Sequence, residues 1–219
     1  MRTDPALAAT EKSVHTSTPE QARAEYAARI VSCVKANPSL LAALHTAREL
    51  QLPQWCIAAG AIRNLVWSHI HGMDFEPGEI DLVYWDDADA DSSAERDQAL
   101  QAQLAQRMPQ FDWDVTNQAG VHYWYRGEDG RRFAPFASTL AGMASWPETA
   151  TAVGVSLDEA DQLQIWAPVL AHGDTGLADL FALRLRHNPA RVSQAQFQAR
   201  LAQKRFLQRW PRLTLVGAD

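Results

Sequence analysis

Residues 55–85 constrain the fold most, because two strand patterns flank a helical one in WCIAAGAIRNLVWSHIHGMDFEPGEIDLVYW. The short apolar run WCIAA, bounded by Pro53 and Gly60, is typical of a buried strand. Apolar residues then recur at helical spacing from Ala61 to about His71, and Gly72 can end this helix. EIDLVYW alternates with a period of two, which predicts a second strand.

The remaining patterns continue this alternation of strands with helices, which favours the α+β class with an α/β-like order. TPEQ is a capping box that begins a helix with Thr18 as N-cap, and Ser92 with Glu95 forms another. We expect helices at about 18–36, 39–50, 92–107, 138–146, 174–185 and 193–210. Further strands are expected at 113–117, 153–156 and 162–166, with a hairpin around 127–130.

The sequence predicts one domain over residues 18–215. Residues 1–17 lack apolar periodicity and are expected to form a disordered arm. A chain of 219 residues with 47% hydrophobic side chains suits one globular domain. Cys33 and Cys56 are too few for a disulfide framework or a thiolate metal site, so both are interpreted as reduced core thiols. The sequence has no membrane-helix run and no signal-peptide core, so we expect a cytoplasmic protein without a membrane partner.

Charge is unevenly distributed along the chain, although its formal net value is −6. Residues 74–97 contain ten acids and the single base Arg96, whereas residues 180–218 contain no acid and eight bases. Both regions could be solvated faces, or they could serve a site that handles metal and phosphate. The acidic total argues against broad nucleic-acid binding, and we expect the basic segment to lie beside the site instead.

The strand EIDLVYW carries two carboxylates on one side, because Glu79 and Asp81 are two residues apart. Adjacent like charges are costly unless a cation neutralises them, and a hard cation such as Mg²⁺ prefers carboxylate oxygens. Asp114, in the strand WDVTN, is the candidate for a third carboxylate of a phosphoryl-transfer site.

The turn between the first strand and the helix is a candidate phosphate site. Gly60 would let a ligand approach the backbone at the helix N-terminus, and Arg63 could bind the same phosphate as a fork. The alternative is that Gly60 only makes a tight turn, while Glu79 and Asp81 end an exposed strand.

These features resemble the nucleotidyltransferase fold of the polymerase-beta superfamily, with a glycine turn, an acid, apolar, acid triplet and a third acid on another strand. More narrowly, the chain is similar to a bacterial family of uncharacterised nucleotidyltransferases. The blocks that carry this similarity lie between about residues 53 and 213: GAIRNLVWSHIHG, EIDLVYWD, WDVTNQAGVHYWY, WPETATAVGV, AP with DLF, and KRFLQRWP. The resemblance implies a small mixed sheet flanked by helices, with the N- and C-terminal helices packed on it.

The resemblance also implies metal-dependent transfer of a nucleotidyl group from a nucleoside triphosphate to an unidentified acceptor, with release of pyrophosphate. It assigns Mg²⁺ or Mn²⁺ to Glu79, Asp81 and Asp114, and the phosphate turn to Gly60. Together with the argument from the residues, this makes Gly60, Ala61 and Arg63 the expected nucleotide-binding residues. Ala61 replaces the usual serine and Glu79 the usual aspartate, and the spacing from Ala61 to Glu79 is longer than the superfamily pattern. The alternative is therefore a nucleotide-binding or interaction module that kept the fold and lost turnover.

Other polar residues allow both functional and structural interpretations. His69 and His71 are two apart on a helix and so suit a surface or helix-end role, and His122 suits either the site or the core. Asn117 and Gln118 could contact a base or ribose edge, or serve as turn residues. The threonine-rich WPETATAVGV could line a nucleotide pocket or form a turn and cap.

Overall fold

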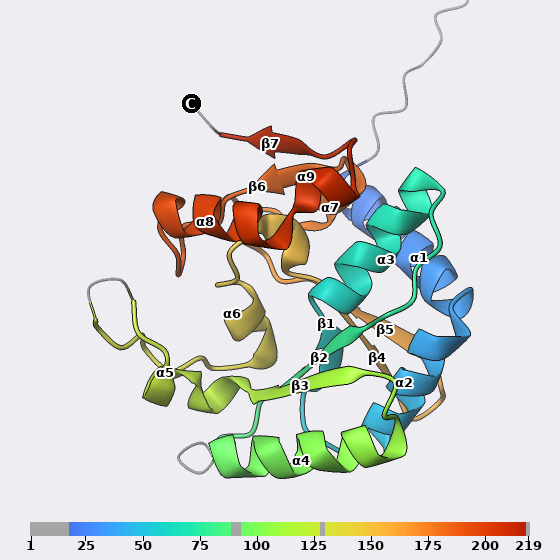
Figure 1. Cartoon of the computed structure of the whole chain (residues 1–219), viewed down its shortest axis with the longest axis vertical. Helices are drawn as coiled ribbons and strands as arrows, with labels where there is room; N and C mark the ends of the chain where they lie inside the picture. Colours follow the sequence, from blue (N-terminus) through green and yellow to red (C-terminus); the bar gives the residue numbers. More distant parts are fainter. Residues whose placement is uncertain (1–17, 89–92, 128–129, 218–219) are drawn as a thin grey trace, which may run out of the picture.

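The computed structural model describes residues 18–88, 93–127 and 130–217, and Figure 1 shows their arrangement. The arm expected at residues 1–17 lies outside these ranges. The capping box expected at Ser92 and Glu95 also depends on a residue outside them.

A five-stranded mixed sheet forms the centre, which confirms the expected α+β fold. Its order is β3 (Asp112–Asn117), β2 (Glu79–Tyr84), β1 (Cys56–Ala58), β4 (Gly154–Leu157) and β5 (Leu163–Trp166). β2 and β3 are parallel, whereas the other neighbours are antiparallel. The parallel pair carries the acidic residues at one end of the sheet.

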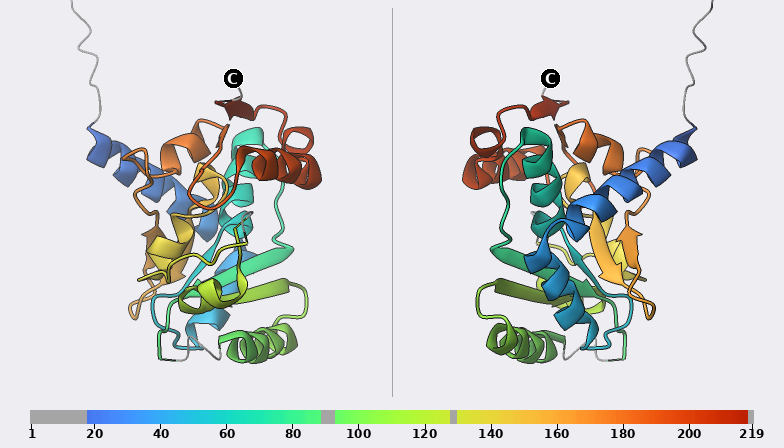
Figure 2. Two further views of the ribbon diagram at one scale, coloured as in Figure 1. Left: turned by 90° about the vertical axis from the view of Figure 1, so that its left-hand side faces the viewer. Right: turned by 90° about the vertical axis from the view of Figure 1, so that its right-hand side faces the viewer.

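Helices α1 (Pro19–Lys35), α2 (Pro38–Arg48) and α3 (Gly60–His71) cover one face of the sheet (Figures 1 and 2). The capping box at Thr18 forms as expected, since Thr18 and Gln21 each accept a hydrogen bond from the other's backbone N–H. α4 (Ser93–Arg107) packs beside β3. Strand alternation directs Ile80 and Leu82 into the main core beneath these helices.

The opposite face of the sheet carries a smaller apolar cluster and leaves space for a pocket. Cys56, Ala58 and Val83 project to this face and pack with side chains of α6 (Thr139–Met143) and the residues after it. Cys33 and Cys56 are both buried free thiols, as the sequence predicted. Because Val83 is on this face, Asp81 and Glu79 are on it too.

The C-terminal part packs against α3 and borders the pocket. α7 (Leu177–Phe181), β6 (Arg184–Arg186), α8 (Gln194–Lys204), α9 (Phe206–Arg209) and β7 (Thr214–Val216) follow in order, and β6 pairs with β7 in parallel. Trp67 of α3 makes edge contacts with Phe206 and Trp210, with ring centroids 5.8 and 5.2 Å apart. The N- and C-terminal helices therefore both pack on the central unit, as the resemblance implied.

Several expected boundaries differ in the structure. The helix expected at 174–185 ends early, because Leu183 has a left-handed backbone (φ 56°) and the chain enters β6. Arg205 (φ 51°) divides the helix expected at 193–210 into α8 and α9. At the hairpin expected around 127–130, the described residues show an antiparallel bridge between Arg126 and Arg132, and η1 (Gln118–Gly120) and α5 (Val121–Trp124) precede it.

No helix in the described part of the chain has the length and apolar character needed to cross a membrane.

Candidate active site

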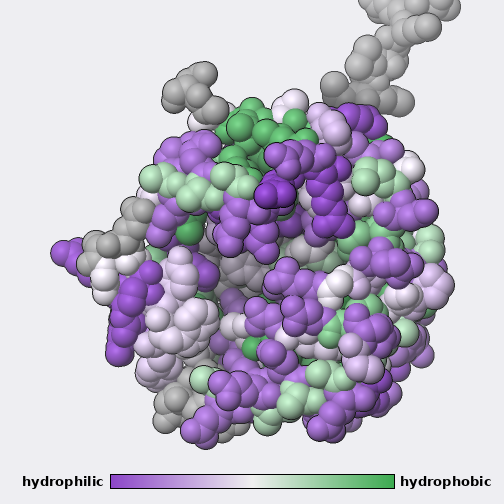
Figure 3. Space-filling view, in the orientation of Figure 1, coloured by the Kyte–Doolittle hydropathy of each residue, from purple (hydrophilic) through white to green (hydrophobic). Residues whose placement is uncertain are grey.

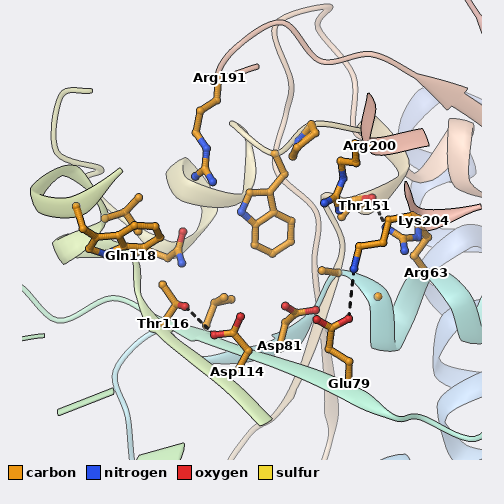
Figure 4. Close-up of a pocket in the computed structure, with 17 residues that line it drawn as sticks. Arg63, Glu79, Asp81, Asp114, Thr116, Gln118, Thr151, Arg191, Arg200 and Lys204 are labelled. Carbon is orange, nitrogen blue, oxygen red and sulfur yellow. Dashed lines mark hydrogen bonds and ion pairs between the residues drawn. The ribbon is translucent and has the colours of Figure 1, made fainter. Parts of the chain in front are cut away.

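Three carboxylates predicted from the sequence come together on β2 and β3. Asp81 and Asp114 are direct partners across these parallel strands, and Glu79 lies two residues before Asp81 on the same face. All three line one pocket (Figure 4). Glu79 and Asp114 are exposed, whereas Asp81 is half-buried between them. The strand register therefore produces the acidic floor that the sequence spacing predicted.

The charge of Asp81 is not fully compensated by its surroundings. Burial raises its pKa to about 6, and the charges of Glu79 and Asp114 act in the same direction. Arg63 and a hydrogen bond from the Gly60 backbone N–H oppose this shift and do not cancel it. A cation bound here would relieve the repulsion among these acids.

In the turn from β1 into α3, the residue with an unusual backbone conformation is Ala59. Ala59 has φ 51° and ψ −119°, a region that favours glycine, and Gly60 is the first residue of the helix. A Cβ added to Gly60 would lie 3.8 Å from Asp81 Oδ2, which is an ordinary contact. The glycine-like turn expected at Gly60 is thus made one residue earlier, while Ala59 and Gly60 both line the pocket.

The side chain of Ala61 belongs to the core and is 1% exposed. Any nucleotide contact from this residue would come from its backbone. A serine at this position would therefore place its hydroxyl in the core and not on the pocket wall.

Arg63 lines the pocket from beneath and is held by several partners. Its Nη1 donates to Thr151 Oγ1 at 2.6 Å, and its Nε and Nη2 donate to Asn64 Oδ1 at 3.1 and 2.9 Å. Its guanidinium also lies over the rings of Trp67 and Phe206. Burial lowers the pKa of Arg63 to about 10, with Glu148 opposing that shift, so the residue remains a fixed cation near neutral pH.

A buried carboxylate connects Arg63 to the C-terminal helix. Glu148 is 0% exposed, accepts from Arg200 Nε at 2.5 Å and from Thr151 Oγ1 at 2.9 Å, and lies 4.0 Å from Arg63 Nη1. Glu148 is thus the anchor of an ionic network, which the turn-and-cap interpretation of WPETATAVGV did not include. Thr151 lines the pocket, as the alternative interpretation of that block anticipated.

Cations from the acid-free segment form the wall opposite the acidic floor. Arg191, Arg200 and Lys204 line the same pocket, so this segment lies where its charge predicted. Lys204 Nζ is 3.6 Å from Glu79 Oε2, and both side chains are substantially exposed (Figure 4). Figure 3 shows the same front face of the molecule, where hydrophilic side chains surround a hollow below the C-terminal elements. The sequence indicated the segment, but only the fold shows which of its eight bases face the acids.

Other candidates from the sequence lie elsewhere. His71 accepts from the Arg212 backbone N–H and contacts the Trp67 carbonyl, which is the helix-end role expected for it. His122 contacts the Ala119 carbonyl and does not line the pocket. The buried Asn117 accepts from the Ala119 N–H and donates to the Asp86 carbonyl, so it is a turn residue.

The pocket has a volume of about 320 Å³, which is within the usual range for a small-molecule site. The sequence profile of the family described as Nucleotidyltransferase matches residues 45–215. The chain belongs to this nucleotidyltransferase family. The matched region includes every pocket residue named above.

A solved structure supports the same fold for this chain. It is titled "The NMR structure of the protein reveals a CCA-adding enzyme head domain", is 26% identical with a TM-score of 0.70, and covers 85% of this chain and 94% of that one. A more distant match, "Structure of tRNA-processing enzyme complex 3", is 18% identical with a TM-score of 0.47 and an 80% coverage of this chain. This chain spans 43% of that longer protein. No curated protein sequence matches the chain.

The three carboxylates of the pocket suit a hard divalent cation, since their oxygens belong to groups that repel one another. Within residues 18–88, 93–127 and 130–217, no group of three Asp, Glu, His or Cys side chains is already arranged around one metal position. The exposed ion pair of Glu79 with Lys204 is of a weak kind and would not withhold Glu79 from a cation. The residues therefore fit the metal by chemistry and charge.

Proposed function

We propose that the chain transfers a nucleotidyl group from a nucleoside triphosphate to a hydroxyl of an acceptor and releases pyrophosphate. One observation carries this proposal: a floor of three carboxylates faces a wall of three cations across a single pocket. A polyphosphate needs cations for its oxygens, and its transfer needs carboxylates for metal and proton. Membership of the nucleotidyltransferase family supports the same reaction class.

In this proposal Glu79 and Asp81 hold Mg²⁺ or Mn²⁺, which would neutralise phosphate oxygens when bound. Asp114 accepts the proton of the acceptor hydroxyl, or contributes to metal binding. The acceptor oxygen forms a bond to the α-phosphorus while the bond to the pyrophosphate oxygen breaks, and pyrophosphate leaves with its electron pair. The register that pairs Asp114 with Asp81 supports these adjacent roles.

The phosphates would be bound between the turn and the C-terminal helix. Arg200 and Lys204 project from α8 towards the floor, and Arg63 supplies a buried positive charge beside them (Figure 4). Arg63 already donates to Thr151 and Asn64, so we assign it a smaller share of direct phosphate contact than Arg200 and Lys204. The backbone N–H groups at the start of α3 would add to this anion site.

The test is a paired measurement on wild type and Asp114→Asn. Nucleotide affinity with Mg²⁺ should be retained, while pyrophosphate release should fall at least about a hundredfold, since a positioned base contributes that much or more. Asp112→Asn is the matched control, because Asp112 is an exposed residue of the same strand outside the pocket. The acceptor panel should include oligonucleotides, because the similar structure is described as a CCA-adding enzyme head domain. Equal turnover in wild type and Asp114→Asn would contradict the role of Asp114.

The second candidate is a nucleotide-binding module without turnover. It is favoured by the ion pair of Glu79 with Lys204, which gives this carboxylate a cationic partner without a metal ion. Tight binding of a nucleoside triphosphate with no pyrophosphate release across the acceptor panel would support this module over the enzyme.

A further inference from the structure

Gln118 carries a buried amide without a partner among the described residues. It is 3% exposed and lines the pocket, and its Oε1 accepts no hydrogen bond. Its neighbour Asn117 has its side chain fully engaged in the turn. The two amides that the sequence could not distinguish are therefore different: Asn117 builds the turn, whereas Gln118 lines the pocket with its Oε1 packed towards Gly142. A buried amide oxygen left unpaired is costly, and this one is packed towards Gly142, so a rotation of the amide would let it bind a ligand in the pocket.

The fold leaves a specific space for this amide. A Cβ added to Gly142 in α6 would lie 2.2 Å from Gln118 Oε1 and 3.0 Å from its Cδ. Only glycine at position 142 allows the Gln118 side chain to occupy this position. Two separate segments, η1 and α6, thus define where the amide lies.

An exposed aromatic residue borders the same part of the pocket. Trp124 lies at the end of α5, is 56% exposed and lines the pocket. Its neighbour Tyr123 is 42% exposed and does not line the pocket. A large indole left exposed at the mouth of a polar pocket is suited to stacking on a flat ring, and each such stack is worth a substantial share of binding energy.

We propose that Gln118 and Trp124 form the nucleobase subsite of this pocket, with the Gln118 amide contacting the base edge and Trp124 stacking on its face. The proposal rests on the proposed function, because the base is that of the bound nucleoside triphosphate. Figure 4 shows Gln118 and the cations Arg200 and Lys204 on opposite sides of the pocket, with Asp81 and Asp114 between them. Phosphates held at the cations would therefore extend the base towards Gln118.

The amide has the chemistry to discriminate among bases. When the amide rotates away from Gly142, its Oε1 can accept one hydrogen bond and its Nε2 can donate one, so it can pair with a base edge that offers a donor next to an acceptor. An amide that makes both bonds discriminates against the wrong base by roughly tenfold or more. Stacking on Trp124 does not depend on base identity, because every base has a π face. We therefore expect changes at Gln118 to alter the preference among bases and changes at Trp124 to alter the affinity for all of them.

The experiment measures the affinity of the full chain with Mg²⁺ for ATP, CTP, GTP, UTP and the base-free probe tripolyphosphate. Wild type should prefer at least one nucleotide. Gln118→Leu should reduce that preference about tenfold, and Gly142→Ala should do the same because it displaces the amide. Trp124→Ala should weaken all four nucleotides by about fivefold to a hundredfold. None of these variants should change tripolyphosphate binding.

Matched controls are available for each variant. Tyr123→Ala removes a neighbouring exposed ring outside the pocket, and Gly78→Ala adds a methyl group where nothing lies within 4 Å. Neither control should change any affinity.

Equal affinity of wild type for the four nucleotides would overturn base recognition by Gln118 and leave nucleotidyl transfer standing. Base preference without pyrophosphate release would support the subsite and contradict the enzyme. A loss of tripolyphosphate binding in Gln118→Leu or Trp124→Ala would overturn the subsite, as would the absence of nucleotide binding by wild type.

Discussion

Replacing Asp81 by asparagine should stabilise the metal-free protein at neutral and alkaline pH. The folded protein raises the pKa of Asp81 from its ordinary 3.8 to about 6, mainly through burial and then through Glu79 and Asp114. At about 1.4 kcal/mol for each pH unit, this corresponds to a cost of about 3 kcal/mol for the charged form. An asparagine side chain at this position would carry no charge and would avoid that cost.

The sign of the pH dependence follows from proton binding. Between pH 3.8 and about 6 the folded state binds more protons at Asp81 than the unfolded state, so stability falls as pH rises through this window. Above about pH 6 the cost is fully present. Asp81→Asn should therefore gain nothing over wild type below pH 3.8 and gain most above pH 6.

The assay is thermal and urea unfolding in EDTA across about pH 4.5–8, with Asp74→Asn as the control. Asp74 is an exposed carboxylate of the loop before β2 and lies outside the pocket. For a chain of this size about 3 kcal/mol corresponds to a melting temperature about 6–12 °C higher at about pH 8. Asp74→Asn should show no comparable rise. A variant no more stable than wild type at alkaline pH, or a gain that does not change with pH, would refute the uncompensated charge on Asp81.

Further predictions concern the surroundings of the pocket. Glu148→Gln should lower the free energy of unfolding by about 3–5 kcal/mol, because it leaves Arg63 and Arg200 near a neutral partner; a loss below about 1 kcal/mol in urea unfolding would contradict this. Ala59→Gly should raise stability by about 1 kcal/mol, because Ala59 holds a backbone conformation that favours glycine; an unchanged or lower melting temperature would argue against strain. Wild type should not bind duplex DNA tightly at physiological salt, and strong, salt-dependent binding in a gel-shift titration would overturn this.

The central sheet could be predicted from the sequence because its signals are local. Strand alternation in EIDLVYW determines which face Glu79 and Asp81 share, and the structure keeps them on that face. The capping box at Thr18 likewise depends on neighbouring residues. Such features depend on residues two or three apart, and tertiary packing did not override them here.

The opposite wall could not be predicted in the same way, because its residues are distant in sequence. Arg200 approaches Arg63 through Glu148, and these three residues come from α8, α3 and the segment before η2 (Thr149–Thr151). Nothing in WPETATAVGV distinguishes a buried ionic anchor from a turn glutamate. Likewise, the separate roles of Asn117 and Gln118 depend on Gly142, a residue of another helix. The composition indicated a basic segment, but the contacts that its side chains make could be identified only from the fold.

Alanine in place of serine at position 61 is weaker evidence against catalysis than the sequence alone implied. In the structure the Ala61 side chain lies outside the pocket. With 1% exposure the Ala61 side chain belongs to the core, so a serine there would place its hydroxyl among apolar residues. The argument for a degenerate module then rests on Glu79. The pairing of Glu79 with Lys204 is exposed and weak, and a divalent cation competes well with a single ammonium for a carboxylate beside Asp81. Lys204→Met distinguishes the enzyme from the degenerate module. If Lys204 pairs with Glu79 only while no metal is bound, this variant should bind Mn²⁺ with unchanged or higher affinity. If Lys204 is instead a permanent substitute for the metal, the variant should lose stability and still bind no Mn²⁺.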